Sequence, residues 1–489
     1  MARASTLKPY DLVVIGGGTA GLVASRTAAG LGARVVLVER EERGPGGDCL
    51  WTGCVPSKAL IAAGDLAHRM RNAQSVGLTP SEPEIDFARV MEHVHGAQAA
   101  IEPEDSADAL RRDGVEVISG TARFAATGRI EVEGGPTLQY RAALIATGSR
   151  PVVPQLEGLA AADPLTNETV WDLRDRPGRL AILGGGPIGC ELGQAFQRLG
   201  TQVTLVQRRG YLLPKEEPEA RELIAGRLRA DGVDLRLGTK PVRVEGSTLV
   251  VDSGDGGGGE ARVEFDRILV AAGRRPETDD LGLDAIGAEL DEKGGVKVDD
   301  RLATTAKGVY AAGDAVTALP FTHVAGYHGR TVVANALFHT RARVSYDAVP
   351  WATFTDPEVG RVGLTEAGAR ERFGDGAVTF THDYSHNDRA ITAGEAHGFA
   401  KLVGDPKGRL VGATVAAPHG GESIAELAAW VRAGRKIDDV SQTVHAYPTF
   451  SEGQARAADD YLRQKFLNPR VRRFTRPALA LLRRVDRPR

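Results

Sequence analysis

The sequence predicts an α/β fold built on two Rossmann-like dinucleotide-binding domains. Two observations carry this prediction. A short apolar run enters a Gly-x-Gly-x-x-Gly turn at residues 11–21, and the same pattern recurs at residues 180–189. A chain of 489 residues has room for about three domains, so the two nucleotide folds leave space for a third.

The composition narrows the class of protein. Hydrophobic residues make up 42% of the chain and charged residues 26%, as is ordinary for a soluble globular enzyme. No apolar run approaches the ~18 residues that suggest a membrane-spanning helix, and the first residues lack the apolar core of a signal peptide. Three cysteines are too few to form the disulfides that would stabilise a secreted protein of this size. We therefore expect a reducing, cytoplasmic compartment.

The charge is unevenly distributed along the chain. Residues 463–489 hold ten Lys or Arg and one acid, which gives this segment a net charge of +9. Because the whole chain has a net charge of −3, residues 1–462 carry a net charge of −12. An acidic body disfavours nucleic acid as a partner, because a phosphate backbone binds a basic face. The basic tail, residues 466–489, mixes arginines with apolar residues, which would suit weak contact with an anionic membrane surface. Pro469 and Pro477 argue against a long helix there and favour a solvated tail.

The first nucleotide fold runs from the apolar strand at residues 11–15 to Glu39. Its turn glycines permit a tight bend, a close approach of pyrophosphate to the backbone, and packing of helix on strand. The free N–H groups at the start of the following helix favour phosphate. Glu39 ends the second strand, where a carboxylate accepts hydrogen bonds from ribose hydroxyls. The three glycines are Gly16, Gly18 and Gly21.

The second nucleotide fold differs at the ribose position. Gln207, Arg208 and Arg209 stand where the first fold has its acid. Glutamine removes the charge that would repel a 2′-phosphate, and guanidinium groups can hold one through forked hydrogen bonds. We therefore expect NADPH rather than NADH, the alternative being two merely solvated arginines. The turn glycines are Gly184, Gly186 and Gly189.

A cysteine pair follows the first fold. Cys49 and Cys54 are five residues apart, too far for a disulfide along regular helix, so Cys49 must lie on a bent segment that Gly53 can supply. Pro56 suits the first turn of a helix that would place Cys54 at its N-terminus, where the dipole favours thiolate. No other Cys or His pair has the spacing to complete a zinc site, and residues 382–399, with three histidines, fit no metal template. We therefore predict redox chemistry at this pair and no metal site.

At these residues the chain resembles the class I pyridine nucleotide-disulfide oxidoreductases, which include dihydrolipoamide dehydrogenase, glutathione reductase and mercuric reductase. The resemblance covers residues 8–465 and rests on the order of motifs, above all the C-x-x-x-x-C-x-P-x-K segment. It implies FAD as cofactor, with Cys54 against the flavin and Cys49 as the thiol that meets substrate. It also implies a flavin-side pair of Lys58 and Glu191, whose ammonium would stabilise reduced flavin.

Further segments extend the resemblance to the cofactor contacts and the domains. The family's second flavin motif lies at residues 309–314, and an adenine-contacting segment lies at residues 120–122. The implied contacts are Gly47, Asp48, Ala122, Thr147, Gly148, Gly273, Gly313 and Asp314. The implied domains are FAD-binding at 1–150 and 274–347, NAD(P)-binding at 151–273, interface at 348–465, and the basic tail. Residues 254–259 are predicted to form a hairpin tip in the NAD(P) domain.

The C-terminal segment departs from part of the family. The interface domain, α+β in character, implies a homodimer whose active sites each borrow residues from the partner. In lipoamide and glutathione reductases the residue before the proline of this segment is the histidine acid-base, whereas here it is Tyr447, a poor base at neutral pH. Mercuric reductases resemble the chain at this point, yet no cysteine follows Cys190, so their C-terminal cysteine pair is missing. His445 could substitute as the base, with Glu452 as a candidate partner.

These features predict an NADPH-dependent flavoprotein disulfide reductase acting on a small thiol, disulfide or metal-ion substrate, similar to mercuric reductase. One alternative is a dihydrolipoyl dehydrogenase. A second is a reductase that passes electrons from the flavin edge to quinones or metal ions, with the cysteines secondary. A third is a flavin-bearing interaction protein docked through its tail.

Overall fold

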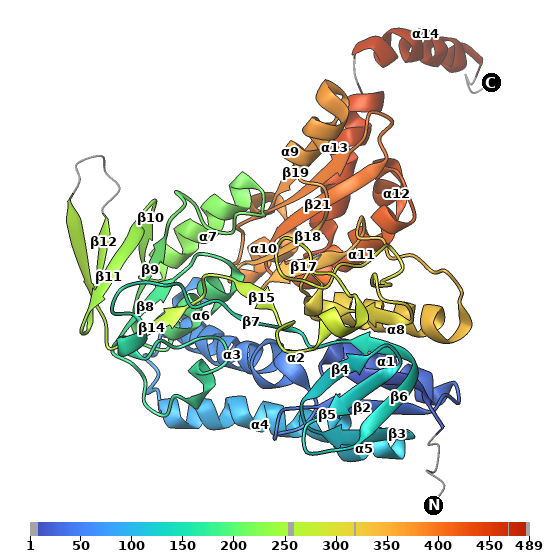
Figure 1. The fold of residues 1–489 in the computed structure, drawn as a ribbon. Helices are drawn as coiled ribbons and strands as arrows, with labels where there is room; N and C mark the ends of the chain where they lie inside the picture. The colour runs from blue at the N-terminus through green and yellow to red at the C-terminus, as the bar shows by residue number, and fades with distance from the viewer. Residues whose placement is uncertain (1–7, 253–258, 317–318, 468, 486–489) are drawn as a thin grey trace, which may run out of the picture. The chain divides into compact units, whose positions relative to one another are not determined.

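The computed structural model describes residues 8–252, 259–316, 319–467 and 469–485, and divides into two compact units (Figure 1). The hairpin tip predicted at residues 254–259 lies almost wholly outside the described residues. The first unit comprises Met1–Arg71, Ser81–Leu212 and Leu228–Ser345. The second comprises Asn72–Pro80, Leu213–Arg227 and Tyr346–Arg489.

The first nucleotide fold of the first unit is a seven-stranded sheet in the order β3-β2-β1-β6-β5-β4, with β16 also paired to β6. Strands β1, β2, β3, β6 and β16 run parallel, and the apolar side chains of β1 and β2 are buried, as expected for a parallel sheet covered on both faces. Helices α1 and α8 pack together beside it. The strands are β1 (Tyr10–Ile15), β2 (Val35–Glu39), β3 (Val115–Ser119), β4 (Ala122–Ala126), β5 (Arg129–Val132), β6 (Thr137–Ile145) and β16 (Val309–Ala311).

The second nucleotide fold is a four-stranded parallel sheet in the order β10-β9-β8-β14. A three-stranded antiparallel sheet, β11-β12-β13, and the short pair β7-β15 complete the strands of the first unit. The strands are β7 (Ser149–Pro151), β8 (Arg179–Leu183), β9 (Gln202–Gln207), β10 (Asp234–Leu237), β11 (Lys240–Glu245), β12 (Thr248–Asp252), β13 (Glu260–Glu264), β14 (Arg267–Val270) and β15 (Arg274–Pro276).

The helices begin where the turn chemistry predicts. In both nucleotide folds a helix, α1 or α6, starts directly after the second glycine of the turn. The helices from the N-terminus through the nucleotide folds are α1 (Thr19–Gly30), α2 (Gly47–Trp51), α3 (Cys54–Arg71), α4 (Phe87–Asp105), α5 (Ala107–Arg112), α6 (Pro187–Arg198), α7 (Pro218–Ala230) and α8 (Thr322–Phe338).

The second unit holds a five-stranded antiparallel sheet in the order β17-β18-β21-β20-β19. Helix α11 packs on β18 and β21, and α13 packs on β19 and β20. The elements are β17 (Pro350–Thr353), β18 (Glu358–Gly363), α9 (Glu366–Phe373), β19 (Val378–Asp383), α10 (Asp388–Ala393), β20 (Phe399–Gly404), β21 (Leu410–Ala417), α11 (Gly420–Arg432), α12 (Ile437–Gln442), α13 (Glu452–Phe466) and α14 (Pro469–Val485). The predicted fold, two nucleotide folds followed by an α+β domain, is confirmed.

The expectation for the basic tail is wrong in one respect. Helix α14 begins at Pro469 and continues through Pro477. Proline is tolerated at the first helical position because its missing N–H has no partner there in any case, and an internal proline costs one hydrogen bond without ending this helix. In the described residues no helix is both long enough and apolar enough to cross a membrane.

Candidate functional site

The two cysteines lie on either side of a break between helices. Cys49 belongs to the short helix α2, and Cys54 is the first residue of α3. A Cβ on Gly53 would lie 2.8 Å from the backbone oxygen of Asp48, so the turn between the helices requires glycine. Cys49 is thus held off the axis of α3, which agrees with the bend expected from the spacing.

The two cysteines differ in the pKa of their thiols. Cys54 Sγ lies 3.3 Å from the hydroxyl oxygen of Thr322, the first residue of α8. The hydrogen bond from Cys49, together with the Thr322 hydroxyl and the Lys58 ammonium, lowers the pKa of Cys54 to about 6. The same hydrogen bond and burial raise the pKa of Cys49. At neutral pH Cys54 is therefore the thiolate and Cys49 keeps its proton.

Beside Cys54, a buried carboxylate fixes a lysine. The Nζ atom of Lys58, one turn along α3, lies 2.9 Å from Oε2 of Glu191 on α6. The Glu191 side chain is 8% exposed and that of Lys58 37%. These are the residues that the resemblance assigns to the flavin side. The buried acid holds the ammonium in place, and the ammonium in turn compensates the charge of the acid.

The turn after β1 is packed so closely that Gly16 and Gly21 cannot carry a side chain. A Cβ on Gly21 would lie 1.9 Å from the backbone oxygen of Gly16, whose φ of +103° also excludes a side chain. Glu39 Oε2 accepts a hydrogen bond of 2.6 Å from the backbone N–H of Gly17, and Oε1 accepts one of 2.9 Å from that of Glu41. Burial raises the pKa of Glu39. The carboxylate thus lies at the mouth of the turn, where a ribose would meet it.

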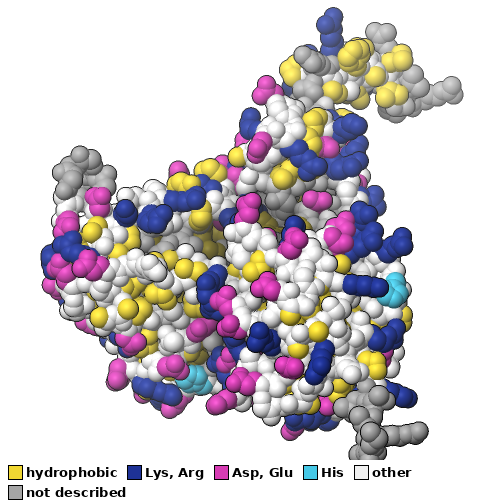
Figure 2. All heavy atoms as spheres, viewed as in Figure 1, with side chains coloured by type: hydrophobic (Ala, Val, Ile, Leu, Met, Phe, Trp, Pro, Cys, Tyr) yellow, Lys and Arg dark blue, Asp and Glu magenta, His cyan; other side chains and the backbone are white. Residues whose placement is uncertain are grey.

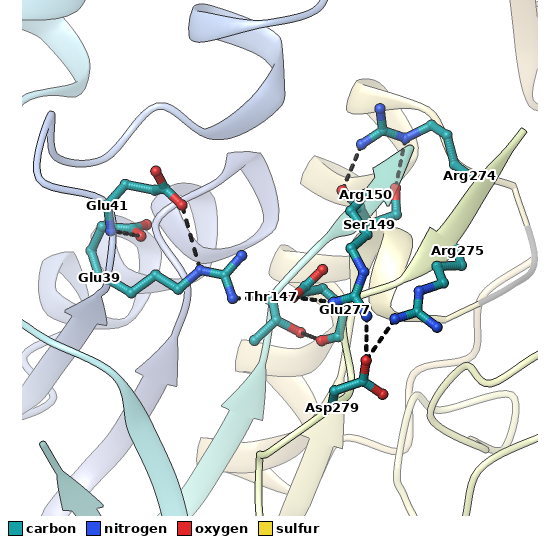
Figure 3. A network of polar contacts seen from close by, with 10 residues as sticks. Glu39, Glu41, Thr147, Ser149, Arg150, Arg274, Arg275, Glu277 and Asp279 are labelled. Carbon is teal, nitrogen blue, oxygen red and sulfur yellow. Dashed lines mark hydrogen bonds and ion pairs between the residues drawn. The ribbon is translucent and has the colours of Figure 1, made fainter. Parts of the chain in front are cut away.

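A chain of polar contacts leads from the cysteine helix to Asp314, and its middle part, between Arg274 and Ser149, is shown in Figure 3. Arg274 pairs with Asp48 of α2 and donates to Ser149 Oγ at 2.8 Å. Ser149 Oγ in turn donates to Asp314 Oδ2 at 2.8 Å. Burial raises the pKa of Asp314, against the hydrogen bond from Ser149. Arg274 therefore positions both the helix that bears Cys49 and the acid that the resemblance assigns to the ribityl chain.

A second ionic cluster joins the strands β7 and β15 to the end of β2 (Figure 3). Glu277 Oε1 lies 2.5 Å from the guanidinium of Arg150 and 3.1 Å from that of Arg40. Asp279 accepts from Arg150 and Arg275. Two segments that are distant in the sequence are thereby held together next to Glu39.

The remaining predicted cofactor residues also lie in the first unit. The Thr147 hydroxyl donates to the backbone oxygen of Glu277 at 2.6 Å, and the Gly313 N–H donates to Nδ1 of His328 at 3.2 Å. Burial lowers the pKa of His328 to about 4, so its ring is neutral and can accept. Gly18 and Gly186 precede α1 and α6, Gly47 opens α2, Ala122 opens β4, and Gly148 and Gly273 flank β7 and β15.

The turn after β8 is packed as closely as the first, but the residues on its ribose side differ. A Cβ on Gly189 would lie 2.0 Å from the backbone oxygen of Gly184. Gln207 ends β9, and Arg208 and Arg209 follow it. A guanidinium nitrogen of Arg209 lies 3.3 Å from the hydroxyl oxygen of Tyr211, which restrains this arginine beside the strand end.

The predicted acid-base residues lie in the second unit and have separate partners. The Tyr447 hydroxyl donates to Asp388 Oδ2 at 2.7 Å, which raises the pKa of the phenol. His445 Nε2 lies 3.0 Å from Glu426 Oε1 on α11, and its Nδ1 lies 2.8 Å from the backbone oxygen of Thr443.

The suggestion that His445 pairs with Glu452 is wrong. Glu452 is the first residue of α13 and is bound one turn later by Arg456, whose Nε lies 2.8 Å away. The His445 side chain, only 8% exposed, is directed at α11 instead.

The third cysteine is isolated from the redox pair. Cys190 is fully buried in α6, its Sγ 3.7 Å from the backbone oxygen of Gly185, and burial raises its pKa. In the described part of the chain, no cluster of three His, Cys, Asp or Glu side chains has the geometry to hold a metal ion.

Comparison with known proteins agrees with this geometry. Residues 10–329 match the family Pyridine nucleotide-disulphide oxidoreductase, and residues 349–458 match its dimerisation domain. The chain belongs to this family.

Relatives of known name cover almost the whole chain. A dihydrolipoyl dehydrogenase of Thermus scotoductus is 37% identical over 93% of this chain and 97% of its own length. A mercuric reductase of Streptomyces lividans is 36% identical over 92% of this chain and 96% of its own. Among solved structures, the Cu(II) complex of the HOCl-induced flavoprotein disulfide reductase RclA from Escherichia coli has a TM-score of 0.81 at 28% identity, covering 93% and 99% of the two chains.

Family membership establishes the general chemistry. The chain is a flavoprotein disulfide oxidoreductase whose family binds FAD and uses NAD(P)H, and its dimerisation domain indicates a homodimer. The residues present fit FAD: the Gly16–Gly21 turn has no room for a side chain, and the buried Glu39 carboxylate supplies ribose acceptors.

Several residues of the site were not found from the sequence. Thr322 lies 268 positions from Cys54, and Arg274 lies 226 positions from Asp48, so no local spacing connects them. Asp388 and Glu426, the partners of Tyr447 and His445, are likewise remote in sequence. The one available signal is that Arg274 directly follows the turn at Gly273, which the resemblance had placed near the cofactor.

Proposed function

We propose that the chain is an NADPH-dependent reductase in the reducing cytoplasm. NADPH reduces the Cys49–Cys54 disulfide to a dithiol, and the dithiol returns to the disulfide as it gives two electrons to a small thiol-reactive substrate, either a metal ion or a disulfide. The observation that carries the proposal is the environment of Cys54, which opens α3 with its Sγ 3.3 Å from Thr322 and Lys58 one turn away. A hydroxyl, an ammonium and a helix N-terminus together favour a thiolate at this position.

The two thiols have different tasks in this proposal. FAD, when bound, supplies the two-electron exchange between a nicotinamide and the cysteine pair. In this proposal the Cys54 thiolate faces the flavin, and Lys58 and Glu191 lie beside it. Cys49 retains a proton in the reduced pair and so needs a proton acceptor, or a cation that displaces the proton, before its sulfur can bond to substrate.

The C-terminal loop favours a metal ion over dihydrolipoamide as the substrate. Oxidation of a dithiol requires a base with a pKa near neutral. Tyr447 cannot fill this role, because its phenol donates to Asp388 and the pKa is raised further. Both ring nitrogens of His445 are engaged, Nε2 with Glu426 and Nδ1 with the backbone oxygen of Thr443, so neither is left to accept a proton from substrate. A soft cation displaces thiol protons by coordination and needs no such base.

Gln207, Arg208 and Arg209 support NADPH as the electron donor. The absence of an acid at the end of β9 and the restraint of Arg209 by Tyr211 suit a 2′-phosphate. The test is anaerobic titration of the purified holoenzyme with NADPH and, separately, NADH. Reduction by NADH alone would overturn the donor assignment.

The same titration tests the cysteine relay. We expect a long-wavelength absorbance band after addition of two electrons, because a Cys54 thiolate in contact with flavin gives one. Bleaching without this band would mean that the cysteines are off the path of the electrons, as in a quinone-type reductase.

Substitution separates these alternatives a second time. The Cys49→Ser variant should lose all turnover with disulfides and mercuric ion if Cys49 meets substrate. A flavin-edge reductase would keep most of its turnover with quinones. Turnover of dihydrolipoamide with NAD⁺ by the wild type, at a rate equal to that with metal ions, would favour the dihydrolipoyl dehydrogenase reading instead.

A further inference from the structure

Helix α14 places most of its apolar side chains apart from a row of arginines. Most of the apolar residues recur at intervals of three and four, which places them on one side, and Arg472, Arg476 and Arg483 fall opposite them. Leu479 is the exception and lies at the border of the arginine row. The apolar side consists of Phe474, Ala478, Leu481 and Leu482. The cationic side consists of Arg472, Arg473, Arg476 and Arg483.

The apolar side of α14 is exposed. Phe474 is 76% exposed, Leu481 63% and Leu482 53%. Figure 2 shows apolar side chains gathered along this helix. A single exposed leucine on a protein surface is ordinary, whereas a row of large apolar side chains along one side of a helix marks a binding surface.

The charge of the helix restricts what that surface binds. Residues 469–485 include six arginines and no acid, so the apolar side is flanked by cations alone. Arginine can lay its aliphatic stem along an apolar phase while its guanidinium remains at the polar boundary. The surface of an anionic bilayer offers both an apolar phase and a sheet of negative charge, whereas a protein partner would have to supply both in one matching groove.

We propose that α14 binds in the plane of an anionic lipid bilayer, with Phe474, Leu481 and Leu482 at the acyl-chain boundary and the arginines among the phosphates. The helix lies on the membrane and does not cross it, since 17 residues with six arginines do not form a span. This docking is separate from the redox reaction and goes beyond the proposed function.

The experiment is sedimentation of the full-length holoenzyme with vesicles. Two compositions are compared, phosphatidylcholine alone and phosphatidylcholine mixed with phosphatidylglycerol. We expect binding to the anionic vesicles only, weakening as sodium chloride rises because exposed charges are screened. Equal binding to both compositions, or to neither, would overturn the proposal.

Matched variants test each side of the helix. Phe474→Ser should weaken binding about tenfold or more, from the lost transfer of the ring out of water. Arg473→Gln with Arg476→Gln should weaken it roughly 25-fold, at about fivefold for each cation near the surface. Ala480→Ser lies among the arginines and should bind as the wild type does. If Ala480→Ser weakens binding as much as Phe474→Ser does, the assigned faces are wrong.

Removal of residues 468–489 distinguishes a lipid bilayer from the other possible binding partners of α14. We expect the truncated enzyme to remain dimeric, to oxidise NADPH with a soluble acceptor at the wild-type rate, and to lose vesicle binding. A shift from dimer to monomer would show that α14 packs on a second copy instead. Retained vesicle binding would assign the membrane contact to another surface, and tighter retention of the wild type on duplex DNA than on vesicles would point to nucleic acid. Each of these results refutes the proposal without bearing on the redox assignment.

Discussion

Replacing Thr322 by valine removes one hydrogen bond from the Cys54 thiolate and leaves the volume of the side chain nearly unchanged. The hydroxyl oxygen lies 3.3 Å from Cys54 Sγ, and a hydrogen bond to a charged group contributes roughly 1.5 kcal/mol. One pKa unit corresponds to about 1.4 kcal/mol, so the Cys54 pKa should rise from about 6 to about 7.

The sign of the change follows from the charge of the group. The hydroxyl stabilises the deprotonated form, so its loss favours the thiol and moves the titration to higher pH. At pH ~6.5 the thiolate fraction should fall from about three-quarters to about one-quarter.

The assay follows the long-wavelength band of the two-electron-reduced holoenzyme as a function of pH. Thr322→Ser keeps the hydroxyl and should titrate as the wild type does. If Thr322→Val has the wild-type midpoint while FAD remains bound, the thiolate is stabilised by Lys58 and the helix N-terminus alone, and the reasoning about Thr322 fails.

Three other variants test the remaining parts of the site. Arg209→Gln should raise KM for NADPH about tenfold while leaving KM for NADH unchanged, because only the 2′-phosphate needs the guanidinium; equal effects on both coenzymes in steady-state kinetics would contradict this. Gly21→Ala should yield protein without FAD, measured by absorbance at 450 nm after gel filtration, because its Cβ would lie 1.9 Å from the Gly16 oxygen, whereas Gly30→Ala, with open space around it, should keep the flavin. Asp388→Asn should lower the Tyr447 pKa toward its ordinary value, since the carboxylate raises it; phenolate absorbance against pH, with Tyr447→Phe as the reference, measures this, and an unchanged titration would show that the contact does not persist in solution.

The parts of the fold that the sequence predicts are those with local causes. An apolar strand, a glycine turn and a helix occupy some 30 consecutive residues, and β1, α1, β8 and α6 lie within a few residues of where the pattern places them. Cys54 begins α3 because Pro56 and Gly53 act within one turn of it.

The site residues that the sequence does not predict depend on tertiary contacts. Thr322 and Arg274 reach the cysteine helices only through the packing of the first unit, and the position of Arg274 after Gly273 does not indicate its contact with Asp48. His445 and Tyr447 are two residues apart, and in an extended segment their side chains would point the same way, but this spacing says nothing about which acids face them. Glu452 is engaged by Arg456 within its own helix, and Glu426 reaches His445 from α11. The tail was misjudged because proline counts against a helix by propensity, while the spacing of its arginines and leucines favours one.

Cys190 stands apart from the redox pair, so it provides a constant reference when the thiols of the enzyme are counted. With its pKa raised and its sulfur fully covered, we expect this thiol to resist alkylating reagents in the native protein. Denaturation exposes it whatever the state of the other two cysteines, so it yields one thiol per chain in every sample. If Cys49 and Cys54 form the proposed disulfide, we expect the thiol count in denaturant to be one per chain for the oxidised enzyme and three for the reduced enzyme, with Cys190 as the constant reference.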